Sequence, residues 1–550
     1  MMQSKTSVPS IFNNVLGPVM RGPSSSHVVS AARIGHMLRC ILTPDIKKIV
    51  IEFSRNSSLA HTYHSQGSDL GLACGLLGIE LSDPEVQNAL SRVDGLVPLQ
   101  YTISDEAATP SDNYANHPNN YKIRLISQGG SCLCIQAIST GGGMFEIWEI
   151  DKIPISLQGD FYALLAMLSP ECSAKELSGR IVRLYPRMEE ISLHNNGESC
   201  ILHCRSRTPF STDLLDYLKG LPEIKNVLSF SPVLPVLSAA RYDMPFYSFE
   251  EFQQLLKRNK KASLWEFAVS YESARGHITE KQVFDMAGDI LSHMRNSVST
   301  GLKPVKYSDR ILPSQAFKIR RAEATGSILP DPLINRVIES IAAVMDAKSA
   351  MKPIVAAPTA GSCGCLPGTL IGLAEHLQLS HEKQVKALLA AGLIGVFFCQ
   401  RATFAAEICG CQVECGAASA MTAGAVAQLL GGSAEQCLSA ASMALSSVTG
   451  LACDPVAGRV EVPCLGKNMM AGANALFSAN MALAGFNCVV PLNEVIDAVY
   501  EIGKALPQSL RCTLGGLGLT PASKRLERVL EKRQSKMVGP ESGGKNPNQN

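Results

Sequence analysis

Cysteine is the residue type with the most potential for chemistry in this sequence, since the chain holds 18 cysteines and 11 of them fall between Cys363 and Cys512. A disulfide scaffold would be a short secreted chain. This chain has 550 residues and its first residues show no apolar leader, so disulfide bonds are a poor explanation. We expect most of the cysteines to be small buried core residues. The remaining few are candidate metal or iron–sulfur ligands, because a thiolate binds both.

A second candidate site lies near the start of the chain, where Gly-Pro-Ser-Ser-Ser-His occupies residues 22–27. Ser24, Ser25, Ser26 and His27 directly precede an expected helix. Three hydroxyls and an imidazole at a helix N-terminus form a donor-rich site for an anion such as a carboxylate. The same residues could equally be an N-cap with spare serines, so the residue types alone leave both interpretations open.

Several other short motifs accompany this run. They are Gly-Gly-Gly at 141–143 with Glu146 after it, Ala-Pro-Thr-Ala-Gly-Ser at 357–362, Cys-Gln at 411–412, Cys-Asp-Pro-Val at 453–456 and Val-Pro-Cys at 462–464. In this order, the motifs resemble those of the iron–sulfur-dependent L-serine dehydratases (L-serine ammonia-lyases). The resemblance covers roughly residues 15–155 and 310–520. It implies a single chain in which the β portion of that family precedes the α portion.

The resemblance implies that Cys411, Cys453 and Cys464 hold a [4Fe-4S] cluster, and that the enzyme works without pyridoxal phosphate. These cysteines lie 42 and 11 residues apart, unlike the tight spacings of ferredoxins, so each would come from a different loop or helix end. Spacing alone would not separate them from core cysteines. Three thiolates leave one iron open, and an open iron is a Lewis acid. The nearby cysteines are interpreted as neighbours rather than ligands; they are Cys363, Cys365, Cys409 and Cys415.

The resemblance also implies the deamination of L-serine to pyruvate and ammonia, a step of amino-acid degradation and gluconeogenesis. A base removes the α-proton, iron helps the hydroxide to leave, and the aminoacrylate then tautomerises and hydrolyses. Lys467 stands where the family usually has arginine, and it could hold the substrate carboxylate only as a point charge. A surface lysine is an equally good interpretation. The expected substrate-binding residues are Ser24, Ser25, Ser26, Gly142, Thr359, Gly361, Ser362, Lys467 and Asn468.

The proton acceptor is where the sequence departs from the family. The family usually carries Gly-His-Gly-Thr-Asp, whereas residues 65–69 read Ser-Gln-Gly-Ser-Asp, and Gln66 cannot act as a base at neutral pH. His27 and His64 are therefore the candidate catalytic residues, with His61 as a further alternative. Each could instead be a hydrogen-bonded structural residue. Family members also often end in a cysteine that folds back onto the open iron; here Cys512, the last cysteine, or no cysteine takes that role.

Three other functions compete with this one. A pyridoxal-phosphate dehydratase is suggested by Ala-Phe-Lys-Ile-Arg at 316–320, but the match is short, and the glycine run at 141–143 precedes Lys318, whereas the phosphate loop of that family should follow the lysine. A surface lysine is the favoured interpretation. A related cluster lyase could act on L-threonine, L-cysteine or another β-substituted amino acid, since Gln66 and Lys467 depart from the family. A catalytically impaired amino-acid sensor is the third, although three intact cluster cysteines argue against it.

The elements that must position these residues indicate a multidomain fold. Strands expected at 47–53, 122–127 and 132–139, with helices at 30–39 and 69–77, predict an α/β (α+β) domain of the dehydratase β type over residues 1–155. Residues 160–238 predict a small ACT-like βα regulatory unit. Its strands are expected at 180–184, 200–205 and 227–231, and its helix at 212–218.

The second half of the chain is predicted to be helical. A helical connector over residues 240–310, with a linker near 297–308, leads to an all-α domain over 311–523 that carries the cluster. Residues 524–550, charged and then rich in Gly, Pro and Asn, predict a disordered tail. Helices are expected at 333–347, 382–404, 420–430, 434–446 and 468–484.

Composition narrows the class of partner. The net charge of +2, with 18% charged residues, shows no basic excess that would favour nucleic acid. The most apolar run, residues 388–399, is too short to span a bilayer and fits a buried core helix. We therefore expect neither nucleic acid nor membrane as a partner. We further expect a cytoplasmic homodimer, and the resemblance implies a small amino-acid substrate.

Overall fold

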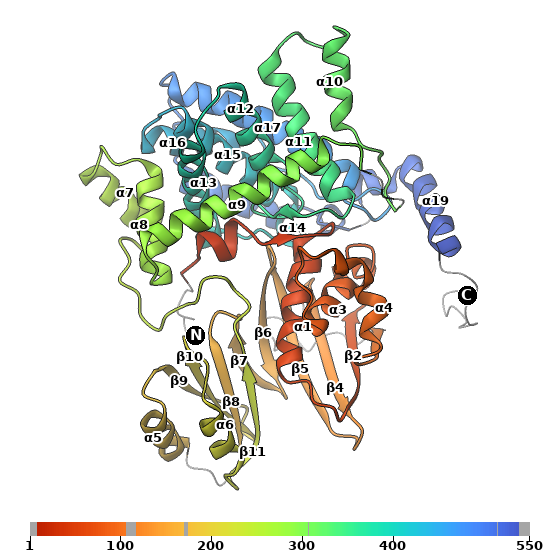
Figure 1. Ribbon diagram of the computed structural model, residues 1–550, viewed down its shortest axis with the longest axis vertical. Coiled ribbons are helices and arrows are strands. Elements are labelled where there is room, and N and C mark those ends of the chain that lie inside the picture. Colours follow the sequence, from red (N-terminus) through yellow and green to blue (C-terminus); the bar gives the residue numbers. More distant parts are fainter. Residues whose placement is uncertain are drawn as a thin grey trace.

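The computed structural model describes residues 8–105, 117–169, 174–305, 307, 309–513 and 515–537. Two β-sheets occupy the first half of the chain, and the second half is almost entirely helical (Figure 1). The predicted order of a mixed α/β region followed by a helical region is therefore confirmed. Within these described ranges, no helix is both long enough and apolar enough to cross a membrane.

The larger sheet has six strands in the order β3-β2-β4-β5-β6-β7. β2 pairs with β3 in parallel, and the other neighbours are antiparallel. Side chains of β4 alternate between buried and half-buried, as a strand with one covered face requires. The strands are β2 (Ile46–Ser54), β3 (Leu99–Ser104), β4 (Asn120–Ser127), β5 (Cys132–Gly141), β6 (Met144–Ile150) and β7 (Ile153–Leu157).

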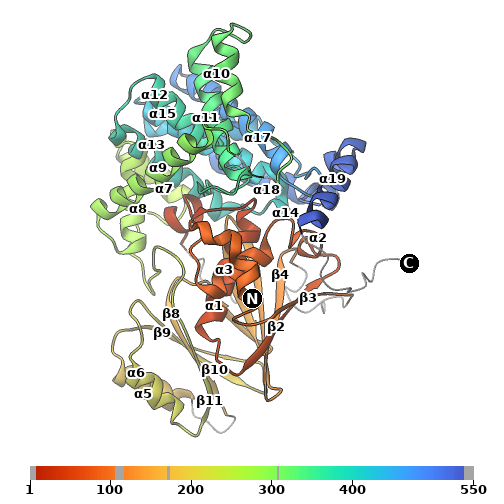
Figure 2. The ribbon, with the colours of Figure 1, turned by 45° about the vertical axis from the view of Figure 1, so that its right-hand side comes forward.

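Helices α1 (Ser30–Cys40) and α3 (Ser68–Leu77) lie side by side over this sheet (Figures 1 and 2). Their backbones touch at glycines. A Cβ on Gly75 would lie 2.0 Å from the carbonyl oxygen of Ala32, and one on Gly71 would lie 2.2 Å from that of Val28. This contact brings the serine-rich turn before α1 next to the turn before α3 that holds Gln66. Short helices α2 (Ser58–Thr62) and α4 (Ala89–Val93) complete this part.

The smaller sheet is a four-stranded antiparallel sheet in the order β11-β8-β10-β9. With its two helices it follows the βαββαβ order of ferredoxin-like units. The strand predicted at 180–184 is wrong, because these residues end helix α5, where Leu177 and Ile181 are buried four residues apart on one face. The elements are β8 (Tyr162–Leu168), α5 (Ala174–Leu184), β9 (Met188–Asn195), β10 (Cys200–Ser206), α6 (Thr212–Lys219) and β11 (Ile224–Phe230).

The helical half packs around α13 and α15; most residues of α13 and nearly all residues of α15 are buried. The apolar run at 388–399 lies inside α13, as predicted. Residues 297–301, predicted to begin a linker, instead continue α9. The helices are α7 (Phe249–Arg258), α8 (Leu264–Gly276), α9 (Glu280–Gly301), α10 (Ala316–Ala324), α11 (Pro332–Ser349), α12 (Cys365–His376), α13 (His381–Arg401), α14 (Ala406–Cys409), α15 (Cys415–Leu429), α16 (Ala434–Ser446), α17 (Glu461–Leu483) and α18 (Leu492–Ala505).

The two ends of the chain depart from a simple division into halves. Strand β1 (Val19–Met20) pairs with β12 (Ile354–Val355), so the N-terminal segment runs along the base of the helical half (Figure 2). The disordered tail predicted from residue 524 is wrong as far as residue 537, since helix α19 (Pro521–Met537) continues to that point. The rest of that prediction, residues 538–550, lies outside the described residues.

Candidate active site

The predicted cluster cysteines lie on three segments of the helical half, with Cys464 within electrostatic reach of Cys411. Cys411 lies in a short helical turn after α14, Cys453 in an extended segment, and Cys464 in the first turn of α17. All three side chains are almost fully buried. The Sγ atoms of Cys411 and Cys453 and a carboxylate oxygen of Glu414 lie within 4.8 Å of one another. The donor set suits a metal or cluster that prefers sulfur ligands.

A fourth cysteine joins this group. Cys512 packs with Cys411, Cys453 and Ala406 in one buried cluster, and its backbone N–H donates to the carbonyl of Cys453 at 2.9 Å. Hydrogen bonds with Cys411 and Cys512, together with burial, raise the pKa of the Cys453 thiol well above its usual range. The last cysteine of the sequence therefore lies beside the predicted ligands.

The cysteines interpreted as neighbours lie in other packing environments. Cys365 and Cys415 share a separate buried cluster with alanines of α15 and α17. The thiol of Cys409 faces the carbonyl of Tyr500 at 3.9 Å. Cys363 belongs to the main apolar core. Cys464 belongs to the same apolar core, and Cys415 lies within electrostatic reach of Cys411 and Cys464, so the distinction between ligands and neighbours stays a prediction.

The β portion reaches the same site through Gln66. Its side chain is 1% exposed, and its Nε2 donates to the Sγ of Cys512 at 3.6 Å. The residue in the expected histidine position thus contacts the cysteine group directly. His64, by contrast, is exposed and paired through Nδ1 with Asp69 at 2.6 Å. That hydrogen bond raises the pKa of His64 above its ordinary value, although partial burial opposes it. His61 is exposed.

His27 is held rigidly inside the protein. Its Nδ1 bonds with the Oγ of Ser24 at 2.9 Å, and its Nε2 bonds with the Oγ1 of Thr62 at 2.8 Å. Burial lowers the pKa of His27 to about 3, so its imidazole is neutral near pH 7. Ser25 accepts a hydrogen bond from the backbone N–H of Ala360, at 3.2 Å, which ties the serine-rich turn to the loop at 357–362.

The loop at 357–362 is held by hydrogen bonds between its own residues and by hydrogen bonds with Asn468. The hydroxyls of Thr359 and Ser362 bond with each other at 3.1 Å. The side-chain amide of Asn468 donates to the carbonyl of Gly361 and accepts from the backbone N–H groups of Gly364 and Cys365. Asn468 therefore holds the loop against α17. Gly142, in the turn between β5 and β6, approaches the same region with φ +61° and lies near the carbonyl of Pro358.

Lys467 is not the surface lysine that one interpretation expected. Its side chain is 16% exposed, and its ammonium bonds with Asp454 at 2.7 Å and with the carbonyl of Ala452 at 2.6 Å. It also contacts the Sγ of Cys411 at 3.7 Å. Burial alone would lower the pKa of Lys467, but the nearby Cys411 and Asp454 raise it. Lys318, in contrast, is exposed on α10 and bonds with Gln315, as expected of a surface lysine.

Sequence reasoning missed three charged groups, of which Glu407 and Lys348 are buried and Glu414 is half-buried. Glu414 accepts from the Cys411 thiol at 3.8 Å. Glu407 lies 3.8 Å from His27, and burial raises its pKa to about 7. Lys348 is buried in the last turn of α11. The two glutamates lie four residues before and three residues after Cys411 in the sequence. This closeness to a predicted ligand was the only signal in the sequence that could have identified them.

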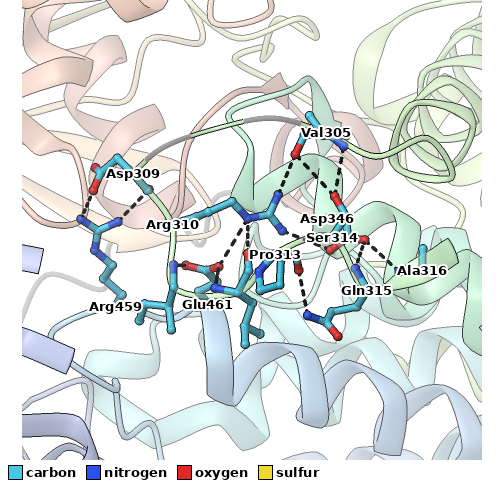
Figure 3. Close-up of polar contacts among 12 residues, drawn as sticks. Val305, Asp309, Arg310, Pro313, Ser314, Gln315, Ala316, Asp346, Arg459 and Glu461 are labelled. Atoms are coloured by element: carbon cyan, nitrogen blue, oxygen red, sulfur yellow. Dashed lines mark hydrogen bonds and ion pairs between the residues drawn. The ribbon is translucent and has the colours of Figure 1, made fainter. Parts of the chain in front are cut away.

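A buried ionic network fixes the elements around the site (Figure 3). Arg310 lies 3.2 Å from Asp346, two residues before Lys348, and 3.9 Å from Glu461, three residues before Cys464. Arg459 pairs with Asp309 in the same segment. The ends of α11 and α17 that carry Lys348 and Cys464 are therefore clamped to a single loop.

Comparison with known proteins adds an independent finding. The family model described as "Serine dehydratase alpha chain" matches residues 259–517. The probable L-serine dehydratase alpha chain of Bacillus subtilis (strain 168) is 36% identical over 285 residues, which are 51% of this chain and 95% of that protein. The probable beta chain from the same organism is 33% identical over 159 residues, 29% of this chain and 67% of that protein. L-serine dehydratase 1 of Escherichia coli (strain K12) is 30% identical over 285 residues, 50% of this chain and 62% of that protein.

Proposed function

Since this chain belongs to the L-serine dehydratase family, with similarity to both its alpha and beta chains, we propose that it deaminates L-serine to pyruvate and ammonia. The observation that carries the proposal is the buried group of Cys411, Cys453 and Cys512, with Cys464 within electrostatic reach of Cys411. The reaction removes an α-proton and expels a poor leaving group, hydroxide.

We further propose that these three cysteines hold a [4Fe-4S] cluster. The site fits such a group, because it is buried, sulfur-rich and flanked by the ammonium of Lys467, which balances thiolate charge. When bound, the cluster supplies Lewis acidity toward the serine hydroxyl. Cys512 packs beside Cys411 and Cys453 but is not one of the three proposed ligands. The protein would thus work with a cluster and without pyridoxal phosphate.

The chain's own residues would bind and orient the substrate. The hydroxyls of Ser24–Ser26 and the loop at Thr359–Ser362 meet where Ala360 bonds with Ser25, so both donor-rich segments face one region. His27 stays neutral and orients Ser24 and Thr62. His64, paired with Asp69, is the proposed histidine for proton transfer, because the hydrogen bond to Asp69 raises its pKa, whereas burial lowers that of His27.

A second candidate is a related lyase for L-threonine, L-cysteine or another β-substituted amino acid. The contact between Gln66 and Cys512 favours it, because the position of the family's histidine is here occupied by an amide engaged with a thiol. Pyruvate from L-serine distinguishes the two. A rate increase in Gln66→His would show that the amide limits serine turnover. The homodimer, the cytoplasmic location and the regulatory role of residues 160–238 remain predictions.

Anaerobic iron–sulfur reconstitution followed by a pyruvate assay tests the proposal. We expect visible cluster absorbance and pyruvate from L-serine in the wild type, and loss of both in Cys411→Ala. Cys437→Ala is the matched control, since Cys437 is equally buried but lies in α16 and bonds with the carbonyl of Gly432. A wild type without cluster absorbance, or an unchanged cluster in Cys411→Ala, would refute the ligand assignment.

A further inference from the structure

An amino-acid carboxylate needs a cation with hydrogen-bond donors to spare, and Lys467 has none. Its ammonium carries three donors. These serve the carbonyl of Ala452, the carboxylate of Asp454 and the Sγ of Cys411. A cation that pairs with the carboxylate inside the site is therefore a residue other than Lys467.

Lys348 is in the opposite situation. The residue is 3% exposed, and its Nζ has no hydrogen-bond partner within the part of the chain that the structure describes. The C-terminal end of α11 favours a positive charge there. A buried ammonium without a partner is nevertheless costly, and such groups are normally paired with an anion. The missing partner is expected to arrive with a ligand.

The surroundings of Lys348 place it beside the cysteine site. Lys348 lies within electrostatic reach of Cys464, a predicted cluster ligand, and of Cys363 and Glu414.

Lys348 also lines a cavity of about 180 Å³ together with Pro23, which precedes the serine-rich turn. This is below the range of about 300–1,000 Å³ typical of sites for drug-sized ligands, and it suits a small metabolite. The other charged side chains that line it have partners. His64 pairs with Asp69, Arg459 pairs with Asp309, and Glu461 accepts from two backbone N–H groups. Lys348 is the unpaired charge of this cavity among the described residues.

We propose that Lys348 is the cation that binds the α-carboxylate of the amino-acid substrate. The inference rests on the proposed function for its choice of ligand, and it replaces Lys467 in the role first expected of that residue. Lys467 then serves as the partner of Asp454 and Cys411.

Binding of L-alanine and L-alaninamide to the cluster-loaded enzyme, measured by anaerobic calorimetry, tests this assignment. L-alanine has no hydroxyl to eliminate, so it binds without turnover, and L-alaninamide lacks the carboxylate charge. The wild type should prefer L-alanine. Lys348→Met should weaken the binding of L-alanine by roughly 30-fold, about 2 kcal/mol, and should leave the affinity for L-alaninamide within about threefold of the wild-type value. Lys348→Arg should keep the preference. Lys352→Met, which removes a half-buried lysine outside the cavity, should change neither value.

Three results would overturn the assignment: equal affinity of the wild type for both ligands, an equal loss for both in Lys348→Met, or an intact preference in that variant. Should Lys348→Met fail to fold or to hold the cluster, Lys348→Gln provides the same comparison with a polar side chain. The pyruvate assay separates this inference from the proposed function. A wild type that shows the carboxylate preference but forms no pyruvate would refute serine deamination while supporting the role of Lys348.

Discussion

Replacement of Arg310 by methionine tests the network that clamps the site (Figure 3). The Arg310 side chain is 6% exposed and lies between two buried carboxylates, those of Asp346 and Glu461. Methionine keeps a long unbranched stem but removes the guanidinium. The variant therefore leaves both carboxylates without their shared cation, with little loss of packing.

The expected loss of folding stability depends on the hydrogen bonds that each carboxylate retains in the variant. Removing one partner of a buried ion pair costs about 3–5 kcal/mol. Asp346 keeps hydrogen bonds from the backbone N–H groups of Gln315 and Ala316, at 2.6 and 2.9 Å. Glu461 keeps two such bonds at 2.8 Å each. We therefore expect the lower end, about 3 kcal/mol, which lowers Tm by roughly 6–12 °C for a cooperative unit of about 150–250 residues.

The pH dependence of this loss provides a second readout. Burial raises the pKa of Asp346, and Arg310 and the backbone N–H groups oppose that shift. Because the folded-state pKa is raised, ionised Asp346 disfavours folding, and protonation at falling pH favours it. Without Arg310 the pKa of Asp346 rises further. The difference in Tm between wild type and Arg310→Met should therefore be smaller at about pH 5 than at about pH 8.

Scanning calorimetry at both pH values measures these effects. Arg321→Met is the matched control, because Arg321 is exposed on α10, and such changes usually stay within about 0.5 kcal/mol. A Tm for Arg310→Met that equals the control would refute the reasoning. A deficit that grows as the pH falls would show that Asp346 is not the carboxylate left without a partner.

Three further predictions follow from separate contacts. Cys512→Ser should keep cluster absorbance and iron content, because Cys512 is outside the proposed ligand set; loss of iron would make it a required ligand. Gly75→Ala should destabilise the protein by about 1–3 kcal/mol, seen as a lower Tm, since its Cβ would lie 2.0 Å from a backbone oxygen of α1; an unchanged Tm would contradict the close helix contact. The bond to Asp69 raises the pKa of His64, so its stabilisation is complete below about pH 6.5 and is lost as the pH rises through the higher folded-state pKa. His64→Gln should remove this component from the pH profile of Tm, and identical profiles would contradict it.

Local patterns in the sequence were sufficient to predict a helix or strand where that element is stabilised by its own residues. Helix α16 begins at Ala434, as predicted, because Ser433 and Gln436 form a capping box around its first turn. Strand β4 was recognisable from its alternation. Residues 180–184 were misassigned, because a short apolar run fits a strand and a helix equally well. Burial of Ile181 together with Leu177, one turn earlier, decides for the helix.

For the site, the sequence by itself determined the residue types and the motifs around Cys411, Cys453 and Cys464, and so the family. Only the tertiary structure decided which polar groups were already occupied. Lys467 is bound to Asp454, and Gln66 contacts a cysteine 446 residues away. Lys348 is buried and has no hydrogen-bond partner among the residues that the structure describes. The physical reason is that hydrogen-bond donors are consumed by whichever acceptors the fold brings within reach, and spacing along the chain does not record those distances.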